Sequence, residues 1–234
     1  MLHEPRQTVY AGRLFWQGFL YDHPVVLALS KIGKVAAATT ACVLIERFGV
    51  RQIVFTGVAG GLGAGVKVGD VVVASEFMQH DLDSSPLFPR YEVPLYGQCR
   101  FAADAALSAL LVRAAQEALV SGLTEQLDQR AFPGACVHTG LIASGDRFVC
   151  GAGESAALLS TLAAAGHPVL AVEMECAAVA QVCHDYSVSF AAMRTISDRA
   201  DDTAHIDFPE FMAKTARVYA SAIMERFVQL LLKT

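Results

Sequence analysis

Short apolar segments alternate with helical segments along the whole chain, and this alternation limits the possible folds more than any other feature. The expected strands lie at 24–29, 52–56, 68–74, 137–143, 168–172 and 189–196. The expected helices lie at 35–48, 102–119, 153–165, 174–185 and about 208–232. Strands that are apolar at successive positions are typical of sheets covered on both faces. We therefore expect an α/β fold with three layers, in which helices flank a mixed, largely parallel sheet.

The sequence contains no linker and no internal repeat, so we expect one such domain over residues 1–234. Of the 234 residues, 54% are hydrophobic and 18% charged, so a large core can form. No apolar run reaches the roughly 18 residues that a membrane-spanning helix needs. A net charge of −5 without basic clusters argues against a nucleic-acid partner.

The six cysteines show neither a Cys-x-x-Cys pair nor a metal-like spacing with histidine. Several lie in apolar stretches, which is typical of reduced core residues. The first residues also lack the basic flank and apolar stretch of a signal peptide. We therefore expect a cytoplasmic protein without a metal site. One long irregular stretch, 80–98, is expected to be functional or part of an interface.

Four segments carry polar or glycine residues where ligands bind in α/β sheets. Gly57–Gly65 follows a strand, although a plain turn explains it equally well. In Ala171–Ala177, attraction to a helix amino terminus explains one of two glutamates. Glu175 falls on the predicted buried face of the helix, which favours a binding role over a structural one.

The other two segments, Ser144–Val149 and Arg194–Asp198, also follow strands. Asp198 has no obvious structural duty except as a helix cap, and an aspartate could protonate a purine leaving group. Phe148 could stack on a base, but a core phenylalanine is the commoner interpretation. The chain has no Gly-x-Ser-x-Gly elbow and no zinc spacing, so nothing indicates nucleophilic or metal catalysis.

Taken together and in order, these segments resemble the 5′-methylthioadenosine/S-adenosylhomocysteine nucleosidases of the nucleoside phosphorylase superfamily. The similarity runs from about residue 8 to the end. The matching strings are Ile32-Gly-Lys-Val-Ala36, Thr56-Gly-Val-Ala-Gly-Gly-Leu62, Lys67-Val-Gly-Asp-Val71, Ser144-Gly-Asp-Arg-Phe148, Val172-Glu-Met-Glu175 and Arg194-Thr-Ile-Ser-Asp-Arg-Ala-Asp201.

The resemblance implies a hydrolase that cleaves the N-glycosidic bond of an adenine thionucleoside through an oxocarbenium-like transition state, without a cofactor. Asp198 would act at adenine N7, Glu175 would hold the ribose hydroxyls, and Arg194 would help to place the attacking water. The implied substrate-binding residues are Ile32, Val58, Phe148, Val149, Met174, Ser197 and Phe208. The resemblance also implies a homodimer, in which a loop matching 82–97 caps the partner's 5′ pocket, and a role in methionine salvage.

The sequence departs from the family pattern in three ways. The family begins with a strand carrying Gly-x-Met-x-x-Glu, whose glutamate activates the water; this sequence is expected to begin downstream of it, because Glu4 is at the wrong distance from Tyr10. Val58 replaces a usual serine. Lys31 replaces a usual glycine, and the loop at 83–91 is unusual. Catalytic rate and 5′ specificity are therefore the properties most affected.

Three alternatives stay open at this stage. Phosphorolysis would need arginines or hydroxyls for phosphate, and the glycine-rich stretch offers no arginine. A futalosine-type nucleosidase would agree with the altered loop. A non-catalytic nucleoside-binding protein would agree with the missing glutamate and with Val58.

Overall fold

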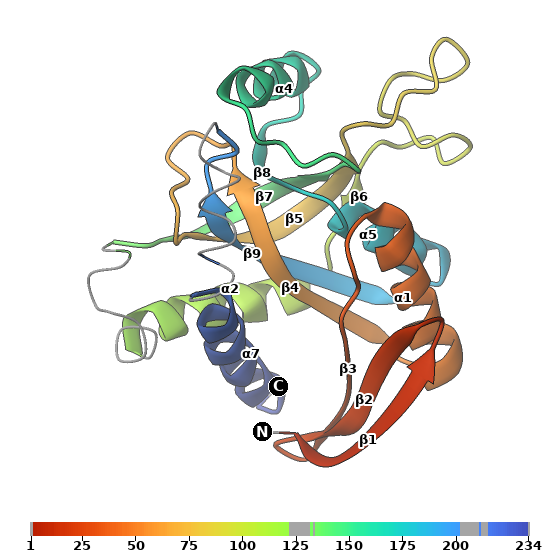
Figure 1. Cartoon of the computed structure of the whole chain (residues 1–234), viewed down its shortest axis with the longest axis vertical. Coiled ribbons are helices and arrows are strands. Elements are labelled where there is room, and N and C mark those ends of the chain that lie inside the picture. The colour runs from red at the N-terminus through yellow and green to blue at the C-terminus, as the bar shows by residue number, and fades with distance from the viewer. Residues whose placement is uncertain (1, 122–131, 133, 202–210, 212–214, 234) are drawn as a thin grey trace.

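The computed structural model describes residues 2–121, 132, 134–201, 211 and 215–233 of the chain. Its larger sheet has six strands in the order β6-β5-β7-β8-β4-β9, and β5 also pairs with β9, which closes five strands into a ring (Figure 1). The strands are β4 (Gln52–Gly61), β5 (Val71–Gln79), β6 (Phe101–Ala102), β7 (Val137–Ser144), β8 (Val169–Glu173) and β9 (Ser189–Asp198). The pairs β4–β9, β5–β7 and β7–β8 are parallel, and β4–β8, β5–β6 and β5–β9 are antiparallel. The expected mixed sheet is confirmed.

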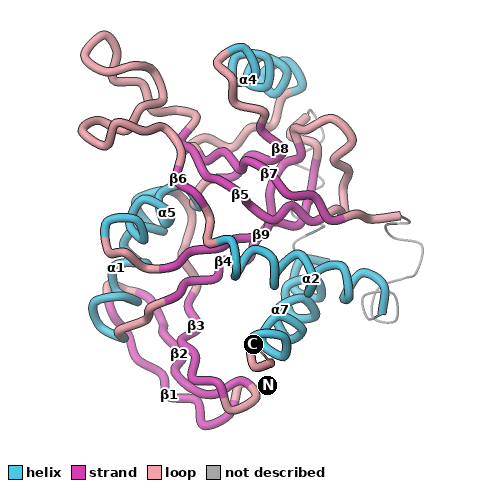
Figure 2. Tube along the Cα trace, turned by 180° about the vertical axis from the view of Figure 1, so that it is seen from behind, coloured by secondary structure: helices cyan, strands magenta, loops and turns pink. Residues whose placement is uncertain are grey.

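Helices cover both faces of this sheet, as expected (Figures 1 and 2). On one face lie α1 (Lys34–Phe48) and α5 (Cys176–Asp185), and on the other lie α2 (Ala105–Ser121) and α7 (Arg217–Leu231). The helix α4 (Ala152–Ala164) packs beside β8 through the buried Leu162. Within the described ranges, no helix has the length and apolar character needed to cross a membrane.

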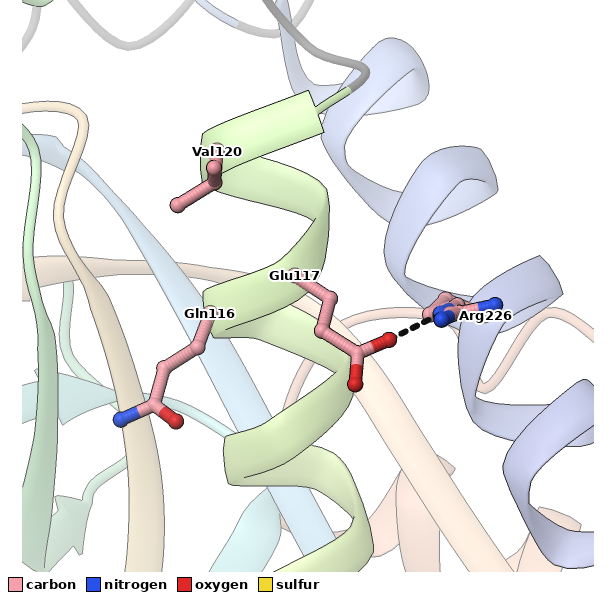
Figure 3. A pocket seen from close by; sticks show the side chains of 4 residues that line it. All are labelled: Gln116, Glu117, Val120 and Arg226. Carbon is pink, nitrogen blue, oxygen red and sulfur yellow. Dashed lines mark hydrogen bonds and ion pairs between the residues drawn. The ribbon is translucent and has the colours of Figure 1, made fainter.

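The layer formed by α2 and α7 packs through an apolar stripe. Leu107, Leu111, Ala114 and Ala118 recur at helical spacing in α2 and are buried with strand residues such as Val71. At the solvent edge of this layer, Glu117 of α2 pairs with Arg226 of α7 beside a shallow hollow (Figure 3). None of the expected site residues lines that hollow.

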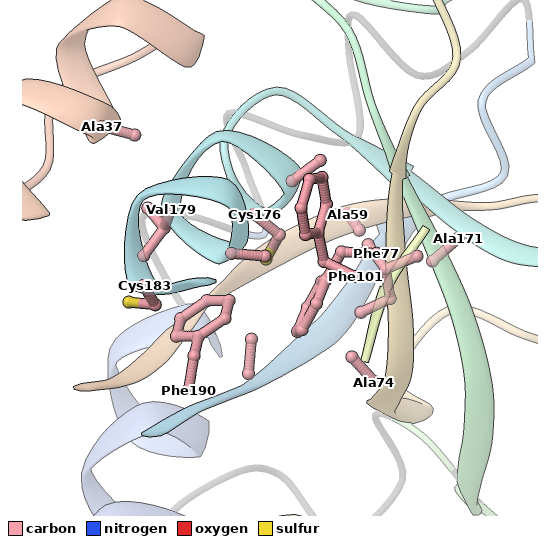
Figure 4. Packing of buried hydrophobic residues seen from close by; sticks show 14 of the residues in the cluster. Ala37, Ala59, Ala74, Phe77, Phe101, Ala171, Cys176, Val179, Cys183 and Phe190 are labelled. Carbon is pink, nitrogen blue, oxygen red and sulfur yellow. The ribbon is translucent and has the colours of Figure 1, made fainter. Parts of the chain in front are cut away.

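The opposite layer buries aromatic side chains of the sheet beneath α5 (Figure 4). Cys176, Val179 and Cys183 lie on one stripe of that helix and belong to the same buried cluster as Phe77 and Phe190. The rings of Phe77 and Phe190 lie 4.8 Å apart between centroids. The two cysteines are reduced and buried, as the sequence indicated for cysteines within apolar stretches.

The amino-terminal residues form a second sheet of three antiparallel strands in the order β1-β2-β3. They are β1 (His3–Tyr10), β2 (Arg13–Leu20) and β3 (His23–Ala28). The strand expected at 24–29 is therefore present but belongs to this small sheet. The small sheet contacts the end of α1, where the ring of Phe15 lies 5.0 Å from that of Phe48. We did not predict β1 and β2, because polar and charged residues interrupt them.

Several element boundaries differ from the expectation. The strand expected at 52–56 continues through the glycines to Gly61, and the strand expected at 68–74 is displaced to 71–79. The helix expected at 174–185 begins at Cys176, because Glu173 still belongs to β8 and Glu175 is the residue before the helix. The stretch 80–98 contains no helix or strand, only an isolated bridge between Val93 and Gln98, as expected.

One edge of β4 is largely unpaired. Its first edge pairs with β9 from Gln52 to Gly60. Its second edge meets β8 only at Gly60 and Gly61. Over 52–59 this second edge pairs with no strand in the described part of the chain.

Candidate functional site

The ends of four strands meet at one side of the larger sheet. Gly60 of β4 lies opposite Val172 of β8, and Ser144 of β7 pairs with Glu173 of β8. The end of β9 runs alongside β4, with Asp198 paired to Gly60. Polar residues that are far apart in the sequence are therefore gathered in one place, as the α/β pattern predicts for the carboxyl ends of parallel strands.

Asp198 and Ser197 end β9 and are both buried. The Asp198 carboxylate accepts hydrogen bonds from Ser197 Oγ at 2.8 Å and from the Ala200 backbone N–H at 2.8 Å. A Cβ atom at Gly60 would lie only 3.0 Å from Asp198 Oδ1 and 2.9 Å from the Ala200 Cβ. Glycine at position 60 is therefore what allows β4 to approach the carboxylate so closely.

Arg194 lies deeper on the same strand, with a side chain only 1% exposed. Its Nη2 donates to Glu173 Oε2 at 2.8 Å, and its Cζ lies 4.3 Å from the centre of the Phe55 ring. A Cβ atom at Gly57 would approach the guanidinium to 3.2 Å. Burial opposes the charge of Arg194, but the nearby acidic groups, including Glu173 and Glu175, outweigh burial and raise its pKa.

Glu175 precedes α5 and is half-buried. Its Oε1 accepts the backbone N–H of Gly33 at 2.9 Å, which links it to the loop before α1. Burial raises the pKa of this carboxyl, and the negative charge of Glu173 raises it further. We expected Glu175 on the buried face of a helix, but this was wrong: Glu173 is the buried glutamate, and Glu175 lies outside the helix.

Sequence reasoning missed Glu173 and Ser144 as members of the site. The Glu173 side chain is 2% exposed and accepts a hydrogen bond from Ser144 Oγ. Both residues stand at the last position of an apolar strand, and that position was the available signal. We assigned the pair of glutamates to a helix, so this signal went unused for Glu173.

The expected base-side residues follow β7. Phe148 is 40% exposed, whereas Val149 is buried in a cluster with Val172 and Ala200. Ala200 also donates to Asp198, so this cluster places Val149 close to the end of β9.

The expected sugar-side residues are less enclosed. Met174 is half-buried between the two glutamates, and Val58 is half-buried on β4 opposite Thr195. Ile32 is 76% exposed and is followed by Gly33, which contacts Glu175. Phe208 lies outside the described residues.

A second polar group, which we did not predict, joins two site loops. Lys34 Nζ donates to Asp81 Oδ1 at 2.6 Å, and the Lys34 backbone N–H donates to Asp146 Oδ1 at 2.8 Å. Asp146 N–H in turn donates to Asp81 Oδ2 at 2.9 Å. These contacts hold the start of α1 against the loop after β7. Lys34 and Asp146 both fall within the matching strings of the sequence.

A mixed α/β sheet flanked by helices, with acidic and hydroxyl groups at its strand ends, agrees with the nucleoside phosphorylase-like class of enzyme that the sequence resembles. The family model described as "Phosphorylase superfamily" matches residues 3–229, and the chain belongs to this superfamily.

Within the superfamily, the chain is similar to proteins described as 5′-methylthioadenosine/S-adenosylhomocysteine nucleosidase. One from Shewanella denitrificans is 35% identical over 98% of this chain and 92% of its own length. One from Exiguobacterium sp. is 37% identical over 95% of this chain and 88% of its own length.

Solved structures agree with this placement. The nucleosidase of Neisseria meningitidis, in complex with methylthio-immucillin-A, matches with a TM-score of 0.83 and 38% identity over 97% of this chain and 90% of its own. The futalosine hydrolase of Helicobacter pylori matches with a TM-score of 0.82 and 30% identity over 97% of this chain and 89% of its own.

Proposed function

We infer that the chain is a nucleosidase that hydrolyses the N-glycosidic bond of 5′-methylthioadenosine and S-adenosylhomocysteine. The products are adenine and the 5-thio-substituted ribose. The observation that carries this inference is the buried Asp198–Ser197 pair at the end of β9, together with the half-buried Glu175. These groups offer an acid for the leaving base and a carboxylate for the sugar.

In the mechanism we propose, Asp198 gives a proton to adenine N7 as the glycosidic bond breaks, which removes negative charge from the leaving base. Phe148 stacks on the base, the Val149 backbone contacts its edge, and Ser197 orients the Asp198 carboxylate. Glu175 binds the ribose hydroxyls, and its negative charge favours the developing oxocarbenium ion.

The proposed site of the attacking water lies on the β4 side of the sugar. The Arg194 guanidinium lies against Gly57, the residue before Val58. In our proposal Arg194 helps to place the water, and Met174 and Val58 contact the sugar side of the pocket. Ile32 and Phe208 complete the 5′ pocket in this proposal.

Hydrolysis is favoured over phosphorolysis because three arginines on β9 and in the loops after β7 and β9 already have protein partners. Arg194 donates to Glu173, Arg147 pairs with Glu154 at 3.0 Å, and Arg199 donates to the Val66 carbonyl. A phosphate site would need such cations directed at an anion, and all three already have protein partners.

Assembly and location also belong to this proposal. We propose that residues 1–234 act as one domain and that two copies form a homodimer. Leu29, Ile32 and Val35 are 86%, 76% and 79% exposed beside the site, so a second copy would cover apolar surface there. All six cysteines are free, which supports a reducing, cytoplasmic location.

The test is adenine release from methylthioadenosine in phosphate-free buffer, compared with an Asp198→Asn variant. Release by the unaltered chain that the variant lacks supports the inference. Release that requires phosphate, with formation of a sugar 1-phosphate, contradicts it. Binding of adenine without turnover would instead identify a nucleoside-binding protein. Because a futalosine hydrolase shares the fold, futalosine is included as a competing substrate.

A further inference from the structure

Glu173 is the buried acid at the centre of the site, and the mechanism above gives it no role. Its carboxylate accepts hydrogen bonds from Ser144 Oγ, from the backbone N–H groups of Glu175 and Cys176, and from Arg194 Nη2. These donors occupy both oxygens of the carboxylate, so no acceptor position is left for substrate. Any effect of Glu173 on the reaction must therefore pass through these partners.

Glu173 takes the place of the usual capping side chain of α5. A helix begins with unpaired N–H groups that a side chain of the N-cap residue commonly accepts. The N-cap residue of α5 is Glu175, and its side chain makes no cap hydrogen bond. Glu173 accepts the N–H of Cys176 at 3.0 Å, and Ser144 Oγ accepts that of Ala177 at 2.8 Å.

The consequence is that the Glu175 carboxylate is directed away from the helix, where it meets the N–H of Gly33. The same Glu173 carboxylate supplies the counter-charge for Arg194, whose side chain is buried on β9. One buried carboxylate thus fixes the two charged groups that the mechanism places around the sugar.

We propose that Glu173 is a positioning residue, which caps α5 and anchors Arg194 so that the Glu175 carboxylate is available for the ribose hydroxyls. This inference rests on the proposed nucleosidase function and assigns a role within that site to a residue that does not touch the substrate.

Two variants separate the effect of the charge of Glu173 from the effect of its side-chain length. Glu173→Gln keeps the size and removes the charge, whereas Glu173→Asp keeps the charge and shortens the side chain by one C–C bond, about 1.5 Å. Displacement of a binding group by about 1 Å can cost about 10²-fold in rate. We expect each variant to lower kcat/KM for methylthioadenosine by about 10²-fold, mainly through a higher KM.

The pH profile distinguishes positioning from a purely structural role. The acid limb of kcat/KM reports groups of the free enzyme that must be ionised. The titratable groups that act on Glu175 are Glu173, Arg194 and the Cys176 thiol, and the loop before α1 donates the Gly33 N–H. Removing the negative charge of Glu173 lowers the pKa of Glu175. The acid limb should therefore move to lower pH in Glu173→Gln and stay in place in Glu173→Asp.

A matched control is Glu117→Gln, which removes the charge of another glutamate that is bonded to arginine (Figure 3). Glu117 belongs to the α2–α7 layer and not to the strand ends that form the site. The kcat/KM of this control should equal that of the unaltered protein. Unchanged kcat/KM in both Glu173 variants would overturn the proposal, as would a loss in Glu173→Gln with an unmoved acid limb. Circular dichroism identifies the variants that fold. If only one of them folds, unchanged kcat/KM in that variant overturns the proposal.

Failure of the proposed function is measured separately, by turnover of the unaltered chain. If that chain releases no adenine, the positioning role is tested by calorimetric binding of methylthio-immucillin-A. At least tenfold weaker binding by Glu173→Asp than by the unaltered chain and Glu117→Gln would support the positioning role. Equal binding by all three would overturn it.

Discussion

Replacing Gly60 with alanine tests whether the close approach of β4 to β9 is what holds the acid in place. The added Cβ would lie 2.9 Å from the Cβ of Ala200 and 3.0 Å from Asp198 Oδ1. Carbon atoms pack at about 3.5–4.0 Å, so the two strands must separate by roughly 0.6–1.1 Å. The atoms in the way belong to the turn that carries the carboxylate, which cannot swing aside like the end of a long side chain.

The expected cost has a structural and a catalytic part. Overpacking of this kind typically destabilises by about 1–3 kcal/mol, and for a chain of this size each kcal/mol lowers the melting temperature by about 2–4 °C. A shift of about 1 Å at the acid is expected to reduce kcat by about 10²-fold. At about 1.36 kcal/mol per tenfold, that is about 2.7 kcal/mol of transition-state stabilisation.

The assay is adenine release with saturating methylthioadenosine, together with a thermal melt. Gly153→Ala is the matched control, since an added Cβ there meets nothing within 4 Å and the site lies in α4, where alanine is the better helix former. That control should keep full activity and melt at the same or a slightly higher temperature. Full activity in Gly60→Ala would refute the reasoning, because the acid would then tolerate displacement of its strand.

Three further changes have defined outcomes. Asp198→Asn should reduce kcat by at least about 10²-fold while calorimetry shows adenine binding largely kept; unchanged turnover would remove this residue from the mechanism. Glu175→Gln should raise KM. Burial and then Glu173 raise the pKa of Glu175 in the folded state, so the unaltered protein should lose stability as pH rises from the ordinary pKa of this carboxyl through the raised one, and the variant should not show this loss. Melts from pH 4 to 8 check this, and an unaltered pH dependence would contradict it. Lys31→Gly should stabilise by about 0.5–1 kcal/mol, since Lys31 has a φ of 64° in the left-handed region; urea unfolding measures it, and a less stable variant would show that the lysine side chain contributes more than its backbone costs.

The fold could be predicted because burial on both faces leaves a clear mark in the sequence. Strands such as Val71–Gln79 are apolar at successive positions, and the helix Ala105–Ser121 has an apolar stripe. The amino-terminal sheet left no such mark, since β1 is mostly exposed and carries charged residues. The extension of β4 through its glycines to Gly61 was also not predicted, because glycine usually indicates a turn. In this strand the glycines leave room for side chains that pack against the backbone.

The site was predictable to the extent that each residue follows a strand. Ser197 and Asp198 end an apolar strand and are buried together. The roles of the two glutamates could not be separated from the sequence, because one residue decides whether a carboxylate closes β8 or opens α5. Contacts such as that of Lys34 with Asp81 join segments 47 residues apart, and spacing along the chain does not specify them.

The unpaired edge of β4 affects how the purified protein is expected to associate during storage. Residues 52–59 read Gln-Ile-Val-Phe-Thr-Gly-Val-Ala and contain no charge and no proline, the usual residues that block pairing with another chain. Molecules that meet at this edge can add strand to strand, a process whose rate rises with concentration. Loss of monomer by this route depends on protein concentration and is not described by a melting temperature alone. We therefore expect the loss of monomer on storage to rise with protein concentration, which size-exclusion chromatography of stocks kept at two concentrations measures.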